Sequence, residues 1–334
     1  MPSAPEFLRF LFLGYAVTEL VEFDAVLAAR QIVAGKLHYT PVFSSEVLSR
    51  RIGARLLLKA ECLQKTGSFK PRGVLNRLRL LSEEERARGL ITVSAGNHAQ
   101  ALAWGARQVG AACTVVMPAN ASRSKAAAAE SYGATVILHG AMAETFAKME
   151  QLRAERNLTL VHPFDDPHII AGQGTVGVEI VEQVPDVTKV VVPVGGGGLI
   201  SGIALAVKRL RPTVKVYGVE PEGAASMFRS RAAGRAVRLD KIETIADGLS
   251  APYTSELTYA MAREYVDDVV TLTDEQIVEA VRLVLAHCKL LVEPAGAAGV
   301  AALLRGKIPL APGDTVVAVL SGGNIDLERL KAIL

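Results

Sequence analysis

Short apolar segments rich in β-branched residues alternate with amphipathic segments along most of the chain, beginning near residue 55. The apolar segments have the length of strands, and several are continuously apolar, which is typical of strands buried on both faces of a parallel sheet. They are residues 90–94, 114–117, 135–139, 158–161, 190–194, 214–219, 269–272 and 316–320. Segments with a helical period lie between them at 100–109, 125–132, 146–155 and 276–287. This alternation predicts right-handed βαβ units in a layered α/β fold.

Length and composition place the chain among ordinary globular proteins. Its 334 residues correspond to about two domains at roughly 150 residues per domain. Apolar residues make up 50% and charged residues 21%, which excludes a disordered or collagen-like chain. The formal net charge is only +3, so the sequence predicts neither a nucleic-acid partner nor a membrane partner. No segment reaches the ~18 consecutive apolar residues that a spanning helix requires.

The cysteines and the N-terminus bear on the cellular compartment. Cys62, Cys113 and Cys288 are far apart and form no CxxC pair, so we expect neither a disulfide framework nor a cysteine-rich zinc site. A reducing cytoplasm fits this usage best. Residues 1–18 are predicted to be an N-terminal leader, not a signal peptide, because the apolar segment at 10–17 runs into acidic residues without a small-residue cleavage site.

Four loops are candidates for chemistry, because ligands in open α/β sheets bind beyond the carboxyl ends of the strands, where helix N-termini direct free N–H groups. These loops are residues 66–73 (TGSFKPRG), 94–98 (SAGNH), 195–198 (GGGG) and 321–324 (SGGN).

The four consecutive glycines at 195–198 favour a phosphate site. A glycine backbone can curl tightly and direct several N–H groups at one anion. The sequence lacks the Gly-Lys-Ser/Thr of a Walker loop and the glycine spacing of a dinucleotide fingerprint. Binding of a nicotinamide cofactor remains an alternative, because Glu220 follows the four glycines at the separation expected for the ribose-binding acid of a dinucleotide fingerprint. A tight turn without a ligand is the other alternative.

Lys70 and the remaining two loops supply side chains. Lys70, if it lies beside a phosphate site, can form a Schiff base once desolvation makes its ammonium group lose a proton. The alternative is that Lys70 is an ordinary surface lysine in a turn before a helix. In the loop at 94–98, backbone N–H groups can bind a carboxylate, and the Asn97 side chain offers a further donor. The alternative is that the side chain of Ser94 or Asn97 caps a helix. We interpret His98 as a packed or orienting residue. Ser321 would project into the same cleft, where its hydroxyl could bond a ring nitrogen, or it caps a helix.

Together these loops resemble those of the serine/threonine dehydratase family of pyridoxal phosphate enzymes, which have the fold type II (tryptophan synthase β-like) architecture. The resemblance covers the chain from about residue 20 onward. Each motif is weak alone, but their number and order are specific to the family. They are 67–73 (GSFKPRG), 94–98 (SAGNH), 170–175 (IAGQGT), 195–198 (GGGG), 246–248 (ADG), 293–294 (EP) and 321–324 (SGGN).

The resemblance implies a role for each loop. Lys70 would hold pyridoxal 5′-phosphate through a Schiff base and then remove the Cα proton of an amino-acid substrate. Further implied cofactor contacts are Phe69 against the pyridine ring, Asn97 at its 3-hydroxyl, Ser321 at its nitrogen, and Gly195, Gly196, Gly197 and Gly198 at the phosphate. The implied contacts with the substrate carboxylate are those of Ser94, Ala95, Gly96, Asn97 and His98.

The implied reaction follows from the partner of the ring nitrogen. A serine hydroxyl is too weak an acid to keep that nitrogen protonated, which favours loss of a β-hydroxyl group over transamination. The resemblance therefore implies an ammonia-lyase that converts L-threonine to 2-oxobutanoate and ammonia, and L-serine to pyruvate. The chain is similar to the short catabolic-type threonine dehydratases, since little sequence follows residue 324 in which a regulatory domain could lie.

The resemblance also implies two open parallel-sheet α/β domains with a cleft between them. The large, cofactor-binding domain would comprise residues 19–88 and 165–334. The small domain, residues 89–164, would bind substrate and close over it, which excludes water. We expect a cytoplasmic homodimer or homotetramer whose ligand is a small amino acid.

Two positions depart from patterns within the family. Ala95 stands where serine-racemising members carry a serine that acts as the acid on the opposite face, so dehydration is favoured over racemisation. Ser226 replaces the aspartate of the family's cation site, to which Glu220 and Ala224 correspond, so we predict no metal. An amino-acid racemase, a β-replacement enzyme related to cysteine synthases, and a non-catalytic small-molecule binding protein remain open alternatives.

Overall fold

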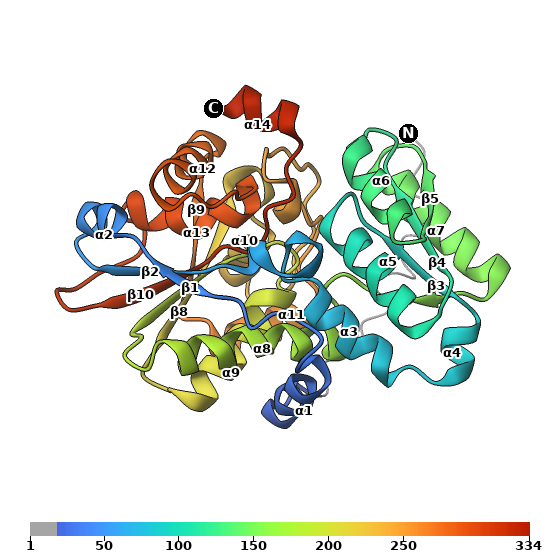
Figure 1. Ribbon diagram of the computed structural model, residues 1–334, viewed down its shortest axis with the longest axis horizontal. Coiled ribbons are helices and arrows are strands. Elements are labelled where there is room, and N and C mark those ends of the chain that lie inside the picture. Colours follow the sequence, from blue (N-terminus) through green and yellow to red (C-terminus); the bar gives the residue numbers. More distant parts are fainter. Residues whose placement is uncertain (1–18) are drawn as a thin grey trace.

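The computed structural model describes residues 19–334 and contains two separate sheets (Figure 1). The leader predicted at 1–18 lies outside the described residues. The 6-stranded sheet has the order β1-β2-β10-β7-β8-β9, and the 4-stranded sheet has the order β5-β4-β3-β6. In Figure 1 the smaller sheet and its helices, in cyan and green, stand beside the larger sheet. Across 19–334, no helix combines the length and apolarity needed to cross a membrane.

The strands of each sheet come from different parts of the chain. The larger sheet comprises β1 (Val42–Ser44), β2 (Arg55–Lys59), β7 (Lys189–Pro193), β8 (Lys215–Pro221), β9 (Asp268–Leu272) and β10 (Thr315–Val319). The smaller sheet comprises β3 (Leu90–Val93), β4 (Cys113–Met117), β5 (Thr135–Leu138) and β6 (Thr159–Leu160). All neighbouring strands are parallel except β1 and β2, which form an antiparallel pair at one edge of the larger sheet.

Helices connect the strands and cover the sheets. In the first half of the chain they are α1 (Phe23–Val33), α2 (Glu46–Ile52), α3 (Pro71–Leu80), α4 (Glu83–Ala87), α5 (Asn97–Val109), α6 (Arg123–Ser131) and α7 (Met142–Arg156). In the second half they are α8 (Pro167–Gln183), α9 (Gly198–Leu210), α10 (Ser226–Ala233), α11 (Glu256–Tyr265), α12 (Asp274–Cys288), α13 (Pro294–Leu304) and α14 (Leu327–Ile333). Short 3-10 turns are η2 (Glu61–Leu63), η3 (Lys65–Gly67), η4 (Glu222–Ala224) and η5 (Asp247–Leu249).

The predicted α/β class with parallel sheets is confirmed, and each predicted strand and helix overlaps an observed one. Helix α9 is buried continuously from Gly198 to Val207, and only its last turn carries charge. The division into 19–88 with 165–334 and 89–164 stays a prediction.

The apolar runs of the larger sheet are explained by burial on both faces. Along β10, Val316 and Ala318 belong to one core cluster and Val317 and Val319 to another. Successive strand residues point to opposite faces, so a strand covered by helices on both sides must be apolar throughout. This is why the strand appears in the sequence as a continuous apolar run.

Helices α8 and α9 lie unusually close, because glycines line their contact. A Cβ added at Gly202 would lie 2.3 Å from the carbonyl oxygen of Ile170 and 2.5 Å from the backbone nitrogen of Gly174. The helix that begins at the tetraglycine is therefore fixed in place by backbone contact. The N-terminus of α9, which carries the tetraglycine turn, is thereby held at a defined place against α8.

We predict that Gly202→Ala lowers the free energy of unfolding by about 1–3 kcal/mol, because the added methyl group forces α8 and α9 apart. Urea denaturation measures the change. Ser201→Ala is the matched control in the same helix: the Ser201 hydroxyl is buried without a hydrogen-bond partner among residues 19–334, so its removal should leave stability unchanged or higher. Equal losses in both variants would contradict the role of the interhelical contact.

Candidate active site

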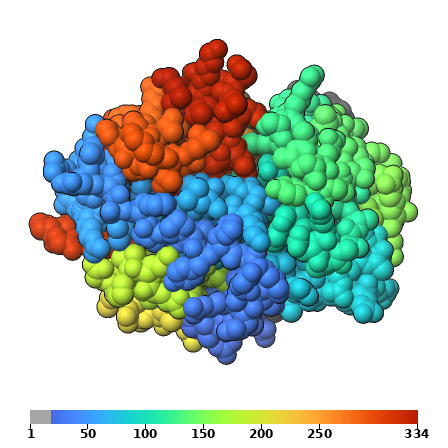
Figure 2. Space-filling view, in the orientation of Figure 1, coloured from blue at the N-terminus to red at the C-terminus, as the bar shows by residue number. Residues whose placement is uncertain are grey.

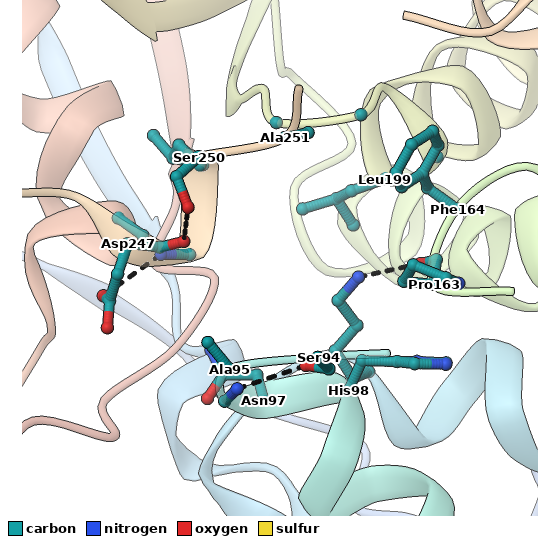
Figure 3. Close-up of a pocket in the computed structure, with 18 of the residues that line it drawn as sticks. Ser94, Ala95, Asn97, His98, Pro163, Phe164, Leu199, Asp247, Ser250 and Ala251 are labelled. Carbon is teal, nitrogen blue, oxygen red and sulfur yellow. Dashed lines mark hydrogen bonds between the residues drawn. The ribbon is translucent and has the colours of Figure 1, made fainter. Parts of the chain in front are cut away.

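The four loops meet in one pocket between the two sheets. Figure 3 shows part of its lining, with Ser94, Ala95, Asn97 and His98 of the second loop facing Leu199 and Asp247 across the pocket. The pocket lies at the carboxyl ends of β3, β7 and β10, as expected for a ligand site in parallel sheets. Every site residue predicted from the sequence lines this pocket: Phe69, Lys70, Ser94, Ala95, Gly96, Asn97, His98, Gly195, Gly196, Gly197, Gly198 and Ser321. The structure thus brings together all of the candidate residues, from segments more than two hundred residues apart.

Backbone pairing holds the first and last loops together. Strand β2 neighbours β10, so the loop after β2 runs alongside the end of β10. Ser68 forms an isolated antiparallel bridge with Gly322, and the Phe69 N–H donates to the Ser321 carbonyl oxygen at 3.1 Å. Lys70 is consequently held at a fixed distance from Ser321.

Lys70 lies immediately before α3, at the N-cap position, with its side chain on the pocket wall. Its Nζ donates a hydrogen bond of 2.8 Å to the Pro163 carbonyl oxygen and lies 5.1 Å from the centre of the Phe69 ring. Desolvation lowers the pKa of Lys70 to about 8, with Glu293 acting in the opposite direction. A neutral amine, the form that can attack an aldehyde or accept a proton, is therefore accessible near neutral pH. This placement contradicts the alternative of a surface lysine.

The tetraglycine turn presents free N–H groups to the pocket. It follows β7, and Gly197 is the N-cap of α9 with a φ of 94°, a conformation that favours glycine. Within the described part of the chain, the N–H groups from Gly196 to Leu199 donate no hydrogen bond. Unpaired N–H groups at a helix N-terminus bind anions, so the turn is suited to a phosphate group.

The second loop forms a similar turn at the start of α5. Gly96 is the N-cap, and no side chain caps the helix, so neither Ser94 nor Asn97 has the capping role considered above. The Ser94 hydroxyl instead accepts a hydrogen bond from the Gly96 N–H at 3.1 Å. The N–H groups of Ala95, Asn97 and His98 have no acceptor among residues 19–334. A second anion, of the size of a carboxylate, can be held here.

The His98 side chain packs beneath this loop. It is 2% exposed, and its Nε2 lies 3.0 Å from the Val161 carbonyl oxygen, which assigns the hydrogen to Nε2. Burial, with the nearby Lys70 charge, lowers the pKa of His98 to about 3, so the ring is neutral. The His98 side chain is therefore packed and neutral, and the His98 N–H is one of the unpaired groups of the turn.

Three charged residues of the pocket had no role assigned from the sequence. The Lys125 Nζ lies 2.7 Å from Asp247 Oδ2 and 3.8 Å from Glu293 Oε2. Glu293 in turn accepts a hydrogen bond from the Asn97 amide group. The motifs at 246–248 and 293–294 signalled two of these residues, whereas Lys125 sits in an ordinary helical segment and carries no sequence signal.

A buried network of charged side chains is centred on Arg72, in the first turn of α3 and two residues after Lys70. The Arg72 guanidinium contacts Glu61 and Glu179, and Glu179 also pairs with Lys59. Arg72, Glu61 and Lys59 are fully buried. Removing one member would leave an uncompensated buried charge, so the network fixes the start of α3 and with it Lys70.

Glu220, considered above as a ribose-binding or cation-binding acid, forms hydrogen bonds with the N-terminus of α10. Its two carboxylate oxygens accept hydrogen bonds from the N–H groups of Met227 and Phe228, at 2.9 and 2.7 Å, at the start of α10. Ser226 accepts a hydrogen bond from Thr254. Both side chains therefore have protein partners, and neither lines the pocket.

A partly desolvated lysine between two anion-binding turns defines a site for a phosphorylated aldehyde cofactor. The chain matches the family of pyridoxal-phosphate dependent enzymes over residues 33–322, and it belongs to that family. The cofactor prediction is thereby confirmed, as is the fold type II architecture. An L-threonine ammonia-lyase of Thermotoga maritima is 44% identical over 316 residues, 94% of this chain and 78% of that protein.

Two further relatives are similar to this chain over the same share of its length, 94%. The catabolic L-threonine dehydratase TdcB of Escherichia coli is 40% identical over 94% of this chain and 96% of its own length. The solved structure of maize serine racemase has a TM-score of 0.90 and 38% identity, covering 94% of this chain and 97% of that one. The predicted resemblance to threonine dehydratases is thereby confirmed.

The residues of the pocket fit pyridoxal phosphate. The unpaired N–H groups of the tetraglycine turn suit its phosphate, Phe69 and Ser321 suit its ring, and Lys70 suits its aldehyde. The glycines are also sterically required: a Cβ at Gly196 would lie 2.3 Å from the Phe164 ring, and one at Gly197 would lie 2.8 Å from Thr258 Cβ.

We predict that Gly197→Ala weakens cofactor binding about tenfold or more, because a left-handed alanine costs about 1–2 kcal/mol and the methyl group displaces the turn. Titration of the apoenzyme with pyridoxal phosphate, followed by absorbance, measures the affinity. Gly234→Ala is the control, since Gly234 has a φ of 67° but a Cβ there meets nothing within 4 Å. This control should lose some stability and keep its cofactor affinity. Equal affinities for both variants would argue against the turn as the phosphate site.

Proposed function

We propose that this protein is an ammonia-lyase that converts L-threonine to 2-oxobutanoate and ammonia, and that also converts L-serine to pyruvate. The observation that carries the proposal is the placement of Lys70 between two turns of unpaired N–H groups, one suited to the cofactor phosphate and the other to a substrate carboxylate. Its similarity to the Thermotoga maritima ammonia-lyase and the Escherichia coli dehydratase supports the same activity.

Each loop then has a task in the reaction. Bound pyridoxal phosphate supplies an aldehyde that attaches the amino acid and a ring that draws electrons from its Cα. The Lys70 amine anchors the cofactor and takes the proton from the substrate Cα. The N–H groups of Ala95, Asn97 and His98 hold the substrate carboxylate, which orients the Cα–H bond toward Lys70. The neutral Ser321 hydroxyl faces the ring nitrogen and favours elimination of the β-hydroxyl group.

The two sheets supply the walls of the site. Segments of the smaller sheet and its helices carry the carboxylate turn, and segments of the larger sheet carry the phosphate turn. We assign residues 89–164 to a small substrate domain that closes on the large domain, residues 19–88 and 165–334. Closure excludes water from the reacting atoms.

Racemisation of serine is the second candidate, favoured by the similarity to maize serine racemase. Ala95 is the discriminating residue, and it lies on the carboxylate turn near Asn97 (Figure 3). An alanine side chain has no proton to deliver to the opposite face of the substrate. Elimination is therefore the outcome that this site favours.

We also propose a cytoplasmic homodimer or homotetramer. The scattered cysteines fit a reducing compartment, and two of the three are buried without a disulfide. Symmetric homo-oligomers are the commonest assemblies of such enzymes.

We predict that Lys70→Ala lowers the release of 2-oxobutanoate from L-threonine about a thousandfold or more, because it removes both the cofactor anchor and the base. Coupled assay of 2-oxobutanoate measures the rate. Borohydride should attach the cofactor covalently to the unaltered protein and not to this variant. Lys65→Ala is the control, since Lys65 immediately precedes the loop at 66–73 and lies against the Trp104 ring, outside the pocket lining. Full turnover by Lys70→Ala would falsify the proposal.

We further predict that the protein converts L-serine to pyruvate without substantial D-serine, and that Ala95→Ser introduces D-serine formation. The reason is that only the variant carries a proton donor opposite Lys70. Chiral chromatography of the reaction mixture separates the two products. Substantial D-serine with little pyruvate from the unaltered protein would establish the racemase instead.

A further inference from the structure

Lys125 connects the two halves of the pocket. It lies in α6, which packs beside the smaller sheet, and its side chain is 6% exposed. Its Nζ reaches Asp247 of η5, between β8 and β9 of the larger sheet, at 2.7 Å. Beside this link, Ser124 donates a hydrogen bond to Asp326, so that α6 meets the C-terminal segment, as the green and red surfaces meet in Figure 2.

Lys125 also lies close to Glu293, the N-cap residue of α13, whose side chain is 2% exposed. Glu293 Oε1 accepts a hydrogen bond from the Asn97 side-chain nitrogen. Glu293 Oε2 is buried and accepts no hydrogen bond from any described residue; Lys125 Nζ, at 3.8 Å, is its nearest cation. A buried carboxylate is ionised only where its charge is compensated, so the Lys125 charge favours the ionised form of Glu293.

The charge of Glu293 decides how the Asn97 amide is oriented. Asn97 Oδ1 accepts a hydrogen bond from Asn324 at 2.8 Å, and its nitrogen donates to Glu293. An ionised Glu293 can only accept, which is compatible with this arrangement. Protonation removes the negative charge of Glu293, so the hydrogen bond from the Asn97 nitrogen loses its charge assistance and the preference for one amide orientation weakens.

We propose that Lys125 is a positioning residue: by pairing with Asp247 and Glu293 across the two sheets, it fixes the orientation of Asn97 toward the 3-hydroxyl of the cofactor. This inference rests on the proposed function, which assigns Asn97 to that hydroxyl. Lys125 itself acts through Glu293 and touches no reacting atom.

The groups that face Glu293 come from several elements. Lys125 of α6 and Arg329 of α14 lower its pKa, Asp247 of η5 raises it, and Lys70 and Cys62 lie close enough to interact with it. Burial outweighs the favourable contacts and raises the pKa of Glu293 to about 7. Glu293 is therefore ionised above about pH 7 and protonated below it. Removing the Lys125 charge raises this pKa further.

We predict that Lys125→Met moves the acid limb of kcat to higher pH, because Glu293 then stays protonated over a wider range. One unit of displacement corresponds to about a tenfold loss of kcat below the limb, with KM for L-threonine little changed. Lys125→Arg should restore the profile. In a Glu293→Gln background, which has no group to titrate, Lys125→Met should cause little further loss. Lys148→Met is the control, since among residues 19–334 Lys148 forms a hydrogen bond only with Gln151 on α7.

A second readout needs no turnover. The visible absorbance of the bound cofactor responds to the hydrogen bond at its 3-hydroxyl, so it should titrate with Glu293 in the unaltered holoenzyme. This titration should move to higher pH in Lys125→Met and vanish in Glu293→Gln. If L-threonine were not a substrate, the proposed function would fail while the absorbance titration would still test the role of Lys125.

Two results would overturn the inference. One is a raised KM in Lys125→Met with an unchanged pH profile and absorbance titration, which would make Lys125 a direct ligand of the substrate carboxylate. The other is an absorbance titration that persists in Glu293→Gln. Because Glu293→Gln keeps the shape of the side chain, it tests the inference even if Lys125→Met fails to fold.

Discussion

The site depends on the buried amine of Lys70, which forms no ion pair with a carboxylate among the described residues. Lys70 has a carbonyl oxygen as its hydrogen-bond acceptor, and its lowered pKa makes the neutral amine accessible. A carboxylate bonded to Lys70 would hold it as an ammonium ion and remove its nucleophilicity. Two carboxylates do line the pocket, but Asp247 and Glu293 are compensated by Lys125. The ion pairs of the pocket therefore protect the reactivity of Lys70.

Two helix N-termini from different sheets provide the rest of the site. The turn before α5 and the turn before α9 each leave backbone N–H groups unpaired, and both open on the same pocket. A ligand with an anion at each end would satisfy both turns at once. Because the donors belong to the backbone, the anion sites are built into the fold, and the side chains nearby are free to select the reaction.

The sequence predicted the architecture and the residues of the pocket because both leave local patterns. Continuous apolar runs predicted parallel strands, and glycine-rich loops predicted anion turns. Helices α8 and α13 have no amphipathic period, since they are buried on nearly all sides, and the sequence did not identify them. Lys125 was missed for a different reason: its partners come from α13 and η5, more than a hundred residues away, and no local pattern encodes a contact of that kind.

The position of β10 in the larger sheet has a consequence for how the molecule is made. Strands β1 and β2 join the rest of that sheet only through β10, which comes last in the chain and lies between β2 and β7. A nascent chain emerging from the ribosome therefore carries Lys70 long before the strand that places it against Ser321 has been synthesised. The complete pocket therefore requires β10, and until β10 pairs, the facing edges of β2 and β7 are unpaired and open to aggregation.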